Sequence, residues 1–276
     1  MKKLTKSIAT SLLKPRAANT HKGSFGHSLI IAGSKGKMGA AVIAAKSCLR
    51  SGTGLLTVNI PQKERIILQT TIPEAMLVMR EDKELDIAKF SAIAIGPGIG
   101  ITPNNKSLLS QIITKSTQPI LLDADALNII ASNKKILSLL KEGTIITPHP
   151  KEFDRLFGEH QNQNDRIKTA IIKAKEYNIV IVLKDHYTTI ANATETYTNT
   201  TGNAGLAKGG SGDALTGIIT AFLAQGYNPF DAAKLGVYIH GLAADIALDN
   251  QCMESMLITD VIDCLGKAFK QISVVN

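Results

Sequence analysis

Short apolar segments alternate with longer segments of helical periodicity along most of the chain. This succession predicts an α/β fold, because each helix crosses back over the sheet and brings the next strand in parallel to the last. We therefore expect a mostly parallel central sheet with helices on both faces. The expected strands are Ser28–Ala32, Leu55–Ile60, Ala75–Met79, Ala92–Ile95, Ile120–Leu122, Thr144–Thr147 and Ile179–Leu183. The expected helices are Met38–Ser51, Asn104–Lys115, Ala126–Ser132, Lys151–Phe157, Asn164–Tyr177, Gly209–Ala224, Pro229–Asp249 and Ser255–Ile272.

Two later segments predict a change of strand direction. Thr188–Ala191 and Thr196–Asn199 flank the polar stretch Asn192–Glu195, which is typical of a hairpin or an antiparallel pair at a sheet edge. No linker rich in Pro, Gly or Ser interrupts the chain, and no internal repeat is present. We therefore expect a single domain over residues 1–276.

The net charge of +8 is unevenly distributed. Residues 1–63 contain eleven Lys or Arg and no Asp or Glu, while the remainder contains twenty basic and twenty-three acidic side chains. Such a segment attracts anions, although ordinary surface lysines would give the same count. Because no aromatic residues interleave with the cations and no nucleic-acid-binding motif is present, a phosphate-rich metabolite is favoured over nucleic acid.

Neither secretion nor membrane insertion is indicated. The longest uncharged segment, Ala214–Phe230, contains polar residues and fits a core helix with its following turn. The apolar segment near the N-terminus is too short and polar for a signal peptide. Cys48, Cys252 and Cys264 form no C-x-x-C pair and lie in helix-like apolar stretches. We expect buried, reduced thiols in a cytoplasmic protein.

A glycine-rich segment ahead of a long apolar helix is the strongest functional signal. Its glycines leave backbone amides uncovered at a helix N-terminus, where the helix dipole also favours anions. The next residue, Asp213, lies in the first turn and can accept a proton from a substrate hydroxyl. Alternatively, Asp213 caps the helix and the glycines allow close packing. The anion hole that we expect for the transferring phosphate consists of Gly209, Gly210, Ser211 and Gly212.

Other clusters follow expected strands, at the end of the sheet where open α/β folds bind ligands. Gly33–Ala41 combines small residues with two lysines, but it fits neither a Walker A loop nor a G-x-G-x-x-G fingerprint. Gly96–Gly100 permits close approach of a ligand or forms a purely structural turn. Asp125 is either a helix cap or a catalytic group. His149, held between two prolines, is a candidate ligand contact or a structural residue, and Lys184 could reach a nucleotide phosphate.

Taken together, these segments resemble the NAD(P)H-hydrate dehydratase family within the ribokinase-like superfold. The resemblance extends over nearly the whole chain, and its specificity lies in the combination. It rests on Pro15-Arg16, His21-Lys22-Gly23, Gly26, Met38–Ala41, Arg50–Leu55, Gly96–Gly100, Asp123–Leu127, Thr147–Pro150, Lys184 and Gly209–Asp213.

The resemblance implies a repair reaction on a damaged cofactor. Hydrated NADH or NADPH carries an extra hydroxyl on its nicotinamide ring. Enzymes of this family phosphorylate that hydroxyl in the S-epimer from ATP or ADP, and loss of phosphate restores the reduced cofactor. The resemblance places the hydrate near Ala40, Gly98, His149 and Asp213. It places the nucleotide on Lys184, Asp185, His186, Tyr187, Thr188 and Gly212.

Further expectations concern the metal and the partners. Mg²⁺ is expected with any phosphoryl donor, and Glu152 is a candidate ligand. The resemblance also implies a homo-oligomer, a tetramer, and a separate epimerase protein, since this chain has no room for a fused epimerase domain. The family usually has Gly at the position of Asp185. The acid there could weaken nucleotide affinity or alter the choice between ATP and ADP.

Three other functions stay open. A ribokinase-like kinase for a small alcohol, such as a vitamin precursor, would release a stable phosphorylated product. A non-catalytic nucleotide-binding regulator would not need a base at Asp213. Nucleic-acid binding rests on charge alone and would appear as salt-sensitive binding to random DNA.

Overall fold

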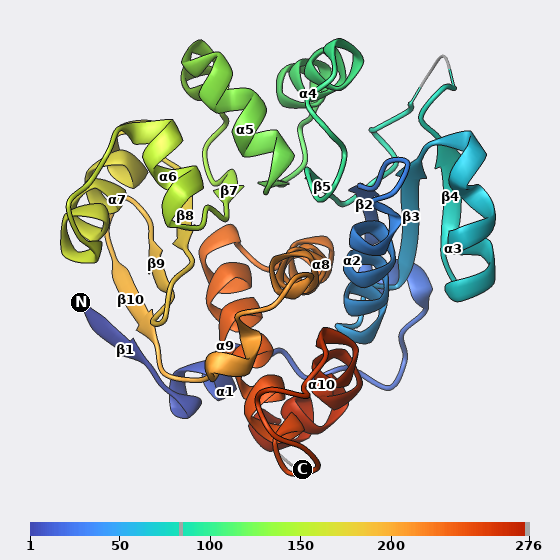
Figure 1. Ribbon diagram of the computed structural model, residues 1–276. Helices are drawn as coiled ribbons and strands as arrows, with labels where there is room; N and C mark the ends of the chain where they lie inside the picture. The colour runs from blue at the N-terminus through green and yellow to red at the C-terminus, as the bar shows by residue number, and fades with distance from the viewer. Residues whose placement is uncertain (83–84, 274–276) are drawn as a thin grey trace.

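The computed structural model describes residues 1–82 and 85–273 (Figure 1). In this part of the chain one ten-stranded sheet runs through the middle of the molecule, in the order β1-β10-β9-β8-β7-β6-β5-β2-β3-β4. The strands from β8 to β4 in that order all run parallel, while β9 pairs antiparallel with both β8 and β10. The strands are β1 (Lys2–Leu4), β2 (His27–Ile31), β3 (Leu55–Ile60), β4 (Met76–Met79), β5 (Ala92–Ile95), β6 (Ile120–Leu122), β7 (Ile145–Ile146), β8 (Val180–Leu183), β9 (Thr189–Ala191) and β10 (Thr196–Asn199).

Helices cover both faces of the sheet, as the alternating pattern predicts (Figure 1). Helices α1, α2, α3, α8, α9 and α10 contribute to one apolar core, and α4, α5, α6 and α7 contribute to the other. Strand β2 contributes side chains to both cores, because Ile30 belongs to the first and Leu29 and Ile31 belong to the second. The helices are α1 (Lys6–Leu12), α2 (Met38–Arg50), α3 (Arg65–Thr71), α4 (Pro103–Lys115), α5 (Asp125–Ser132), α6 (Pro150–Phe157), α7 (Gln163–Tyr177), α8 (Ser211–Ala224), α9 (Pro229–Ala247) and α10 (Ile258–Ile272).

The α/β prediction is confirmed, and each expected strand and helix is present with small changes at its ends. The predicted hairpin is also confirmed as an antiparallel pair, β9 with β10. It does not form the edge of the sheet, because β1 pairs with β10 in parallel, with Lys2 opposite Tyr197. Strand β1 was not predicted, since its three residues include two lysines and its pairing is made by the backbone. The short helices α1 and α3 were also missed.

One prediction about the cysteines is wrong. Cys48 and Cys264 are buried in α2 and α10, as expected, but Cys252 is exposed. Cys252 lies in the loop between α9, which ends at Ala247, and α10, which begins at Ile258, so no helix face buries it. None of the described helices has the length and apolar character needed to span a bilayer.

The close packing of α2 against α8 fixes the helix that carries Asp213. A Cβ added at Gly217, in the middle of α8, would lie 2.1 Å from the Ala44 carbonyl oxygen and 2.2 Å from Ser47 Oγ of α2. The absence of a side chain at Gly217 therefore allows the two helix backbones to touch.

Replacing Gly217 with Ala should force α2 and α8 apart. We expect the free energy of unfolding to fall by about 1–3 kcal/mol, the usual cost of overpacking. Gly266 provides the matched control, because it is an exposed glycine of α10 with no atom within 4 Å of an added Cβ. Gly266→Ala should raise the free energy of unfolding by up to about 1 kcal/mol through helix propensity. Urea denaturation of both variants measures the two effects, and equal shifts would contradict this account of the α2–α8 contact.

Candidate active site

Three loops at the carboxyl ends of β2, β5 and β6 are joined by hydrogen bonds. The Gly33 amide donates to the Pro97 carbonyl at 2.8 Å, and Ser34 Oγ donates to the Gly98 carbonyl at 2.7 Å. The Gly100 amide donates to Asp125 Oδ2 at 2.8 Å. Asp125 is thus the first residue of α5, and its side chain holds the Gly96–Gly100 loop in place. It is not the helix cap, because that position is occupied by Ala124, which makes no side-chain hydrogen bond.

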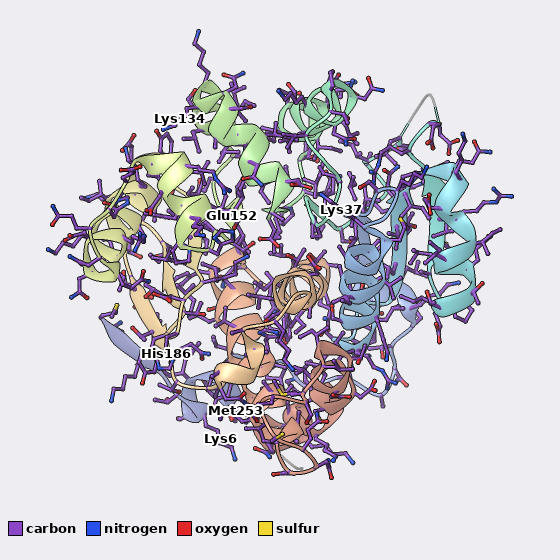
Figure 2. All side chains as sticks on the ribbon, viewed as in Figure 1. Lys6, Lys37, Lys134, Glu152, His186 and Met253 are labelled. Carbon is purple, nitrogen blue, oxygen red and sulfur yellow. The ribbon has the colours of Figure 1, made fainter. Side chains whose placement is uncertain are left out.

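Ala40 and Gly98, predicted as substrate contacts, lie together. Gly98 has a φ of +63°, and a Cβ added to it would lie 3.1 Å from both Ala40 Cβ and the Lys37 carbonyl oxygen. Glycine is therefore needed at this position both for its backbone angle and for its contact with the start of α2. Ala40 and Gly98 thus form a wall of backbone and small side chains at the end of β5, next to the exposed side chain of Lys37 (Figure 2).

His149 caps α6 through one ring nitrogen, and its side chain stays partly exposed. Its Nδ1 accepts hydrogen bonds from the amides of Lys151 and Glu152 at 3.1 and 3.3 Å. Because Nδ1 is the acceptor, the proton of the neutral ring belongs on Nε2. The side chain is 44% exposed, so Nε2 can donate to a ligand. Burial, and after it the positive charge of Lys184, lowers the pKa of His149 and keeps the ring neutral.

Glu152, the candidate metal ligand, is engaged by its own helix. Its Oε2 accepts from the His149 amide at 2.9 Å, which completes the capping box, and its Oε1 lies 3.4 Å from His149 Nε2. Burial raises the pKa of its carboxyl group. In the described residues no group of three or more His, Cys, Asp or Glu is arranged to hold a metal ion.

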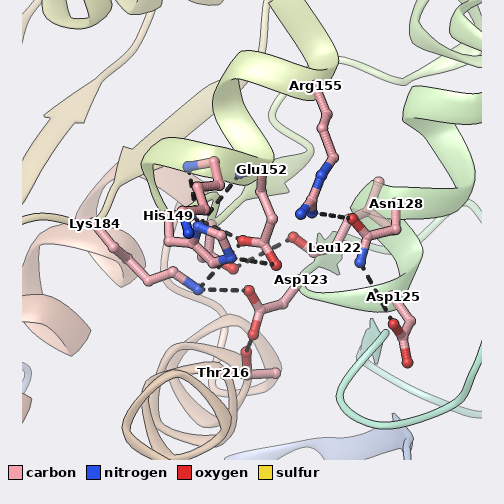
Figure 3. Close-up of polar contacts among 11 residues, drawn as sticks. Leu122, Asp123, Asp125, Asn128, His149, Glu152, Arg155, Lys184 and Thr216 are labelled. Carbon is pink, nitrogen blue, oxygen red and sulfur yellow. Dashed lines mark hydrogen bonds and ion pairs between the residues drawn. The ribbon is translucent and has the colours of Figure 1, made fainter. Parts of the chain in front are cut away.

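Several buried and half-buried charges form a cluster around Asp123, which directly follows β6 (Figure 3). Asp123 is only 1% exposed. Its Oδ1 accepts from Lys184 Nζ at 2.8 Å, and its Oδ2 accepts from Thr216 Oγ1 of α8 at 3.0 Å. Lys184 Nζ also lies 4.0 Å from Glu152 Oε2. Burial opposes the charge on Lys184, but Asp123 and then Glu152 hold its pKa above the ordinary value.

Asp213 lies in the first turn of α8, as predicted, and the structure rejects the helix-cap alternative. The cap residue is Gly210, and no side chain caps this helix. The Asp213 carboxylate accepts no hydrogen bond from any described residue, so it is available to a substrate hydroxyl. Burial, followed by the negative charge of Asp123, raises the pKa of Asp213 to about 6, although Lys184 opposes the shift.

The glycines ahead of Asp213 have different roles. Gly210 has a φ of +93°, and a Cβ there would approach Ile43 and Ile258 to 2.7 and 3.0 Å. Gly212 is helical, and a Cβ there would lie 3.2 Å from Lys184 Nζ. Gly209 is open, with no atom within 4 Å. The amides of Gly212 and Asp213 donate to no acceptor in the described chain, and the Lys184 ammonium lies beside them. This combination is suited to binding a phosphate.

The comparisons with known proteins agree with this geometry. A family model described as NAD(P)H-hydrate dehydratase matches residues 28–267. The chain belongs to the NAD(P)H-hydrate dehydratase family.

Relatives of two lengths are found in this family. The bifunctional NAD(P)H-hydrate repair enzyme Nnr of Moorella thermoacetica is 36% identical over 278 residues, covering 95% of this chain and 52% of that protein. The chain thus spans about half the length of the bifunctional relatives that it matches. The ADP-dependent (S)-NAD(P)H-hydrate dehydratase of Bacillus subtilis is 33% identical over 274 residues, which are 97% of each chain. A crystal structure of the ADP/ATP-dependent NAD(P)H-hydrate dehydratase of Bacillus subtilis, co-crystallised with ATP and Mg²⁺, gives a TM-score of 0.89 at 31% identity over 99% of both chains.

The residues assigned to the nucleotide by family resemblance are divided between two environments. Lys184 turns into the carboxylate cluster, whereas Asp185, His186 and Tyr187 are exposed in the loop between β8 and β9. The rings of His186 and Tyr187 form an edge contact with centroids 4.3 Å apart. Thr188 anchors the end of this loop, since its carbonyl accepts from the Asn199 amide at 2.9 Å.

Sequence reasoning missed two members of this candidate site, Asp123 and Thr216, and a buried histidine near Lys184. Asp123 was noted only as part of a motif, and Thr216 was hidden within an apolar helix. His240 of α9 is 6% exposed, and its Nε2 has no hydrogen-bond partner among the described residues. Burial, with a smaller effect of Lys184, lowers the pKa of His240 to about 4. No local pattern marks these residues, because Asp123 and Thr216 meet only where α8 packs against the end of β6, and His240 comes from a different helix, α9.

The buried charge of Asp213 should reduce the stability of the protein. Its folded pKa of about 6 exceeds the ordinary value of 3.8, so the folded form holds a proton more tightly than the unfolded form. The cost of the charged carboxylate therefore develops as the pH rises from 3.8 to about 6 and persists above it. We expect Asp213→Asn to raise the melting temperature at pH 8 and to lose this advantage near pH 4, as measured by thermal unfolding. A lower melting temperature at pH 8 would contradict this electrostatic account.

Proposed function

We propose that the chain restores NADH and NADPH from the S-epimer of their hydrates, with ATP or ADP as the phosphoryl donor. The observation that carries the proposal is the position of Asp213, a carboxylate without a hydrogen-bond partner beside two uncovered amides and the Lys184 ammonium. This arrangement offers a base and an anion site within one helical turn. Family membership then selects the nicotinamide hydrate over other alcohols.

In the first step the hydroxyl oxygen on the nicotinamide ring attacks the terminal phosphorus of the nucleotide. Asp213 accepts the hydroxyl proton, and the bond from phosphorus to the leaving ADP or AMP oxygen breaks. The amides of Gly212 and Asp213 and the ammonium of Lys184 stabilise the charge that develops on the phosphoryl oxygens. A base with a pKa of about 6 is suited to this role, since it is charged at neutral pH and still binds a proton well.

In the second step the carbon–oxygen bond breaks and inorganic phosphate leaves. A proton is lost from the adjacent ring carbon, and the ring double bond of NADH or NADPH is restored. We place the nicotinamide against the wall of Ala40 and Gly98, where His149 Nε2 can donate to it. The exposed His186 and Tyr187 rings of the nucleotide segment offer an apolar surface to the adenine.

Mg²⁺, when bound with the nucleotide, supplies charge neutralisation to the phosphates. Phosphate oxygens and water would provide most of its ligands, because both Asp123 oxygens and the Glu152 Oε2 are already engaged. Residues of this chain accordingly act on the phosphate through Lys184 and the backbone amides. A tetrameric assembly and an epimerase that supplies the S-epimer remain predictions from the family resemblance.

The direct test is to mix the protein with hydrated NADH or NADPH and ATP or ADP, and to follow recovery of reduced-nicotinamide absorbance. Asp213→Asn keeps the shape of the side chain but removes its basicity, so turnover should fall by about a hundred- to ten-thousandfold. The melting temperature provides the folding control. A stable phosphorylated product without recovery of absorbance would point instead to a kinase, and near-normal turnover in Asp213→Asn would exclude it as the base.

The pH profile separates the electrostatic role of Asp123 from mere packing. Activity should rise as Asp213 ionises, with a midpoint near its pKa of about 6. Asp123→Asn removes a negative charge that raises the pKa of Asp213. The substitution also frees Lys184 from its ion pair, and the positive charge of Lys184 lowers the pKa of Asp213. The midpoint should therefore move to lower pH in the variant, even if the maximum rate also falls. An unchanged midpoint with a reduced rate would assign Asp123 a purely structural role.

A further inference from the structure

A separate cavity lies at the opposite end of α8 from Asp213. Its volume is about 580 Å³, which is in the range of small-molecule sites. The segment after α1 lines it, together with residues at the C-terminal ends of α2, α8 and α10. Because an α-helix rises 1.5 Å per residue, the 14 residues of α8 place this cavity roughly 20 Å from the catalytic base.

The floor of the cavity is apolar and largely aromatic. Phe222, Tyr227 and Phe269 line it, and Leu13 closes one side. The rings of Phe222 and Tyr227 are 5.1 Å apart in an edge contact, and those of Phe222 and Phe269 are 6.0 Å apart. Phe222 is only 1% exposed, so this floor is held by the core rather than by a mobile surface. Such a surface accommodates a flat apolar group.

The rim carries three cations that form no ion pair with any carboxylate of residues 1–82 and 85–273. Lys14 Nζ donates to the Gly226 carbonyl at 3.1 Å and lies 4.5 Å from the centre of the Tyr227 ring. Arg16 donates to the Gly52 carbonyl and stacks on the ring of Phe25. Arg50, in the last turn of α2, makes no ion pair with the described residues. Among the described residues that line the cavity, none is Asp or Glu.

A buried hydroxyl group adds a further unsatisfied polar atom. Ser51 belongs to the lining and is 2% exposed, and its Oγ has no hydrogen-bond partner among the described residues. Its carbonyl is already taken by Gln225 Nε2 at 3.0 Å. Leaving a buried polar atom unpaired is costly, so a polar group brought by a ligand would relieve the cost.

We propose that this cavity binds a small organic anion with a flat apolar body, such as an aromatic carboxylate, sulfonate or phosphate ester. The aromatic floor takes the body, and Lys14, Arg16 and Arg50 take the charge. This site is independent of the proposed dehydratase reaction, since none of its lining residues belongs to the cluster around Asp123 and Asp213. Two segments with no role in that reaction, Pro15-Arg16 and Arg50-Ser51-Gly52, meet here.

A matched pair of fluorescent probes tests the two halves of this proposal. 1-Anilinonaphthalene-8-sulfonate carries a sulfonate on an aromatic body, and N-phenyl-1-naphthylamine has the same body without the charge. In the full-length protein, with ATP present to fill the nucleotide site, the sulfonate should bind with one site per chain and more tightly than the amine. Equal affinity of the two probes would overturn the requirement for an anion.

Arg50→Gln is the most informative variant, because it removes a charge without removing a hydrogen bond seen in the described structure. The dissociation constant of the sulfonate should rise about two- to fivefold, the usual effect of one exposed charge pair. Lys134→Gln is the control, since it removes the same charge from an exposed position just after the end of α5, outside the cavity (Figure 2). An equal loss in both variants, or in neither, would contradict a specific site.

Two further outcomes would also overturn the proposal. If the sulfonate binds only to a variant that ends at Ser273, the occupant is the chain's own C-terminal end. If binding weakens as protein concentration rises and light scattering shows association, the cavity is covered by a second copy. Competition between benzoate and phenyl phosphate at the cavity then distinguishes a carboxylate from a phosphate ligand.

Discussion

The ion pair between Asp123 and Lys184 joins the parts of the molecule on which the site depends. It links the carboxyl end of β6 to the carboxyl end of β8, and Thr216 attaches the same carboxylate to α8. A carboxylate that is 1% exposed would be very costly without such partners. Removing Lys184 would leave the buried Asp123 carboxylate without a compensating positive charge, which is more destabilising than losing the pair as a whole. The position of the ammonium is therefore fixed before any nucleotide binds.

The ammonium group of Lys184 lies close to several carboxylates at once. Asp123 contacts it directly, Glu152 lies 4.0 Å away, and Asp213 lies within its electrostatic reach. One positive charge cannot fully offset three negative ones in a buried site. Asp213 is the carboxylate that is least compensated, because it accepts no hydrogen bond from the described residues, and its pKa rises to about 6. Burial is the main cause of this raised pKa, and the negative charge of Asp123 adds to it, whereas Lys184, which is paired with Asp123, opposes it only in part.

Much of this architecture could be predicted from the sequence because it depends on local patterns. Alternating apolar and helical segments predicted the sheet, and a run of glycines before Asp213 predicted the helix N-terminus. The contacts between segments could not be predicted in this way. Thr216 looks like an ordinary residue of an apolar helix, and β1 is stabilised by backbone pairing with β10 rather than by its side chains. Nor does the glycine run show which of its members needs the left-handed conformation, which is Gly210 and not Gly212.

The basic N-terminal segment shows most clearly how a linear pattern is redistributed by folding. Its charges suggested a single surface that attracts anions, yet the chain crosses the sheet several times within residues 1–63. Lys35 and Lys37 consequently lie at the start of α2, beside the proposed dehydratase site, whereas Lys14, Arg16 and Arg50 lie at the far end around the second cavity. Helix C-termini attract cations, which accounts for part of this second group, because α2 and α8 both end there. The partial charge at each helix end is only about half a unit, however, so it cannot offset three full positive charges. A net positive potential thus remains at each end of α2, and the same sequence bias supplies two separate anion-attracting surfaces.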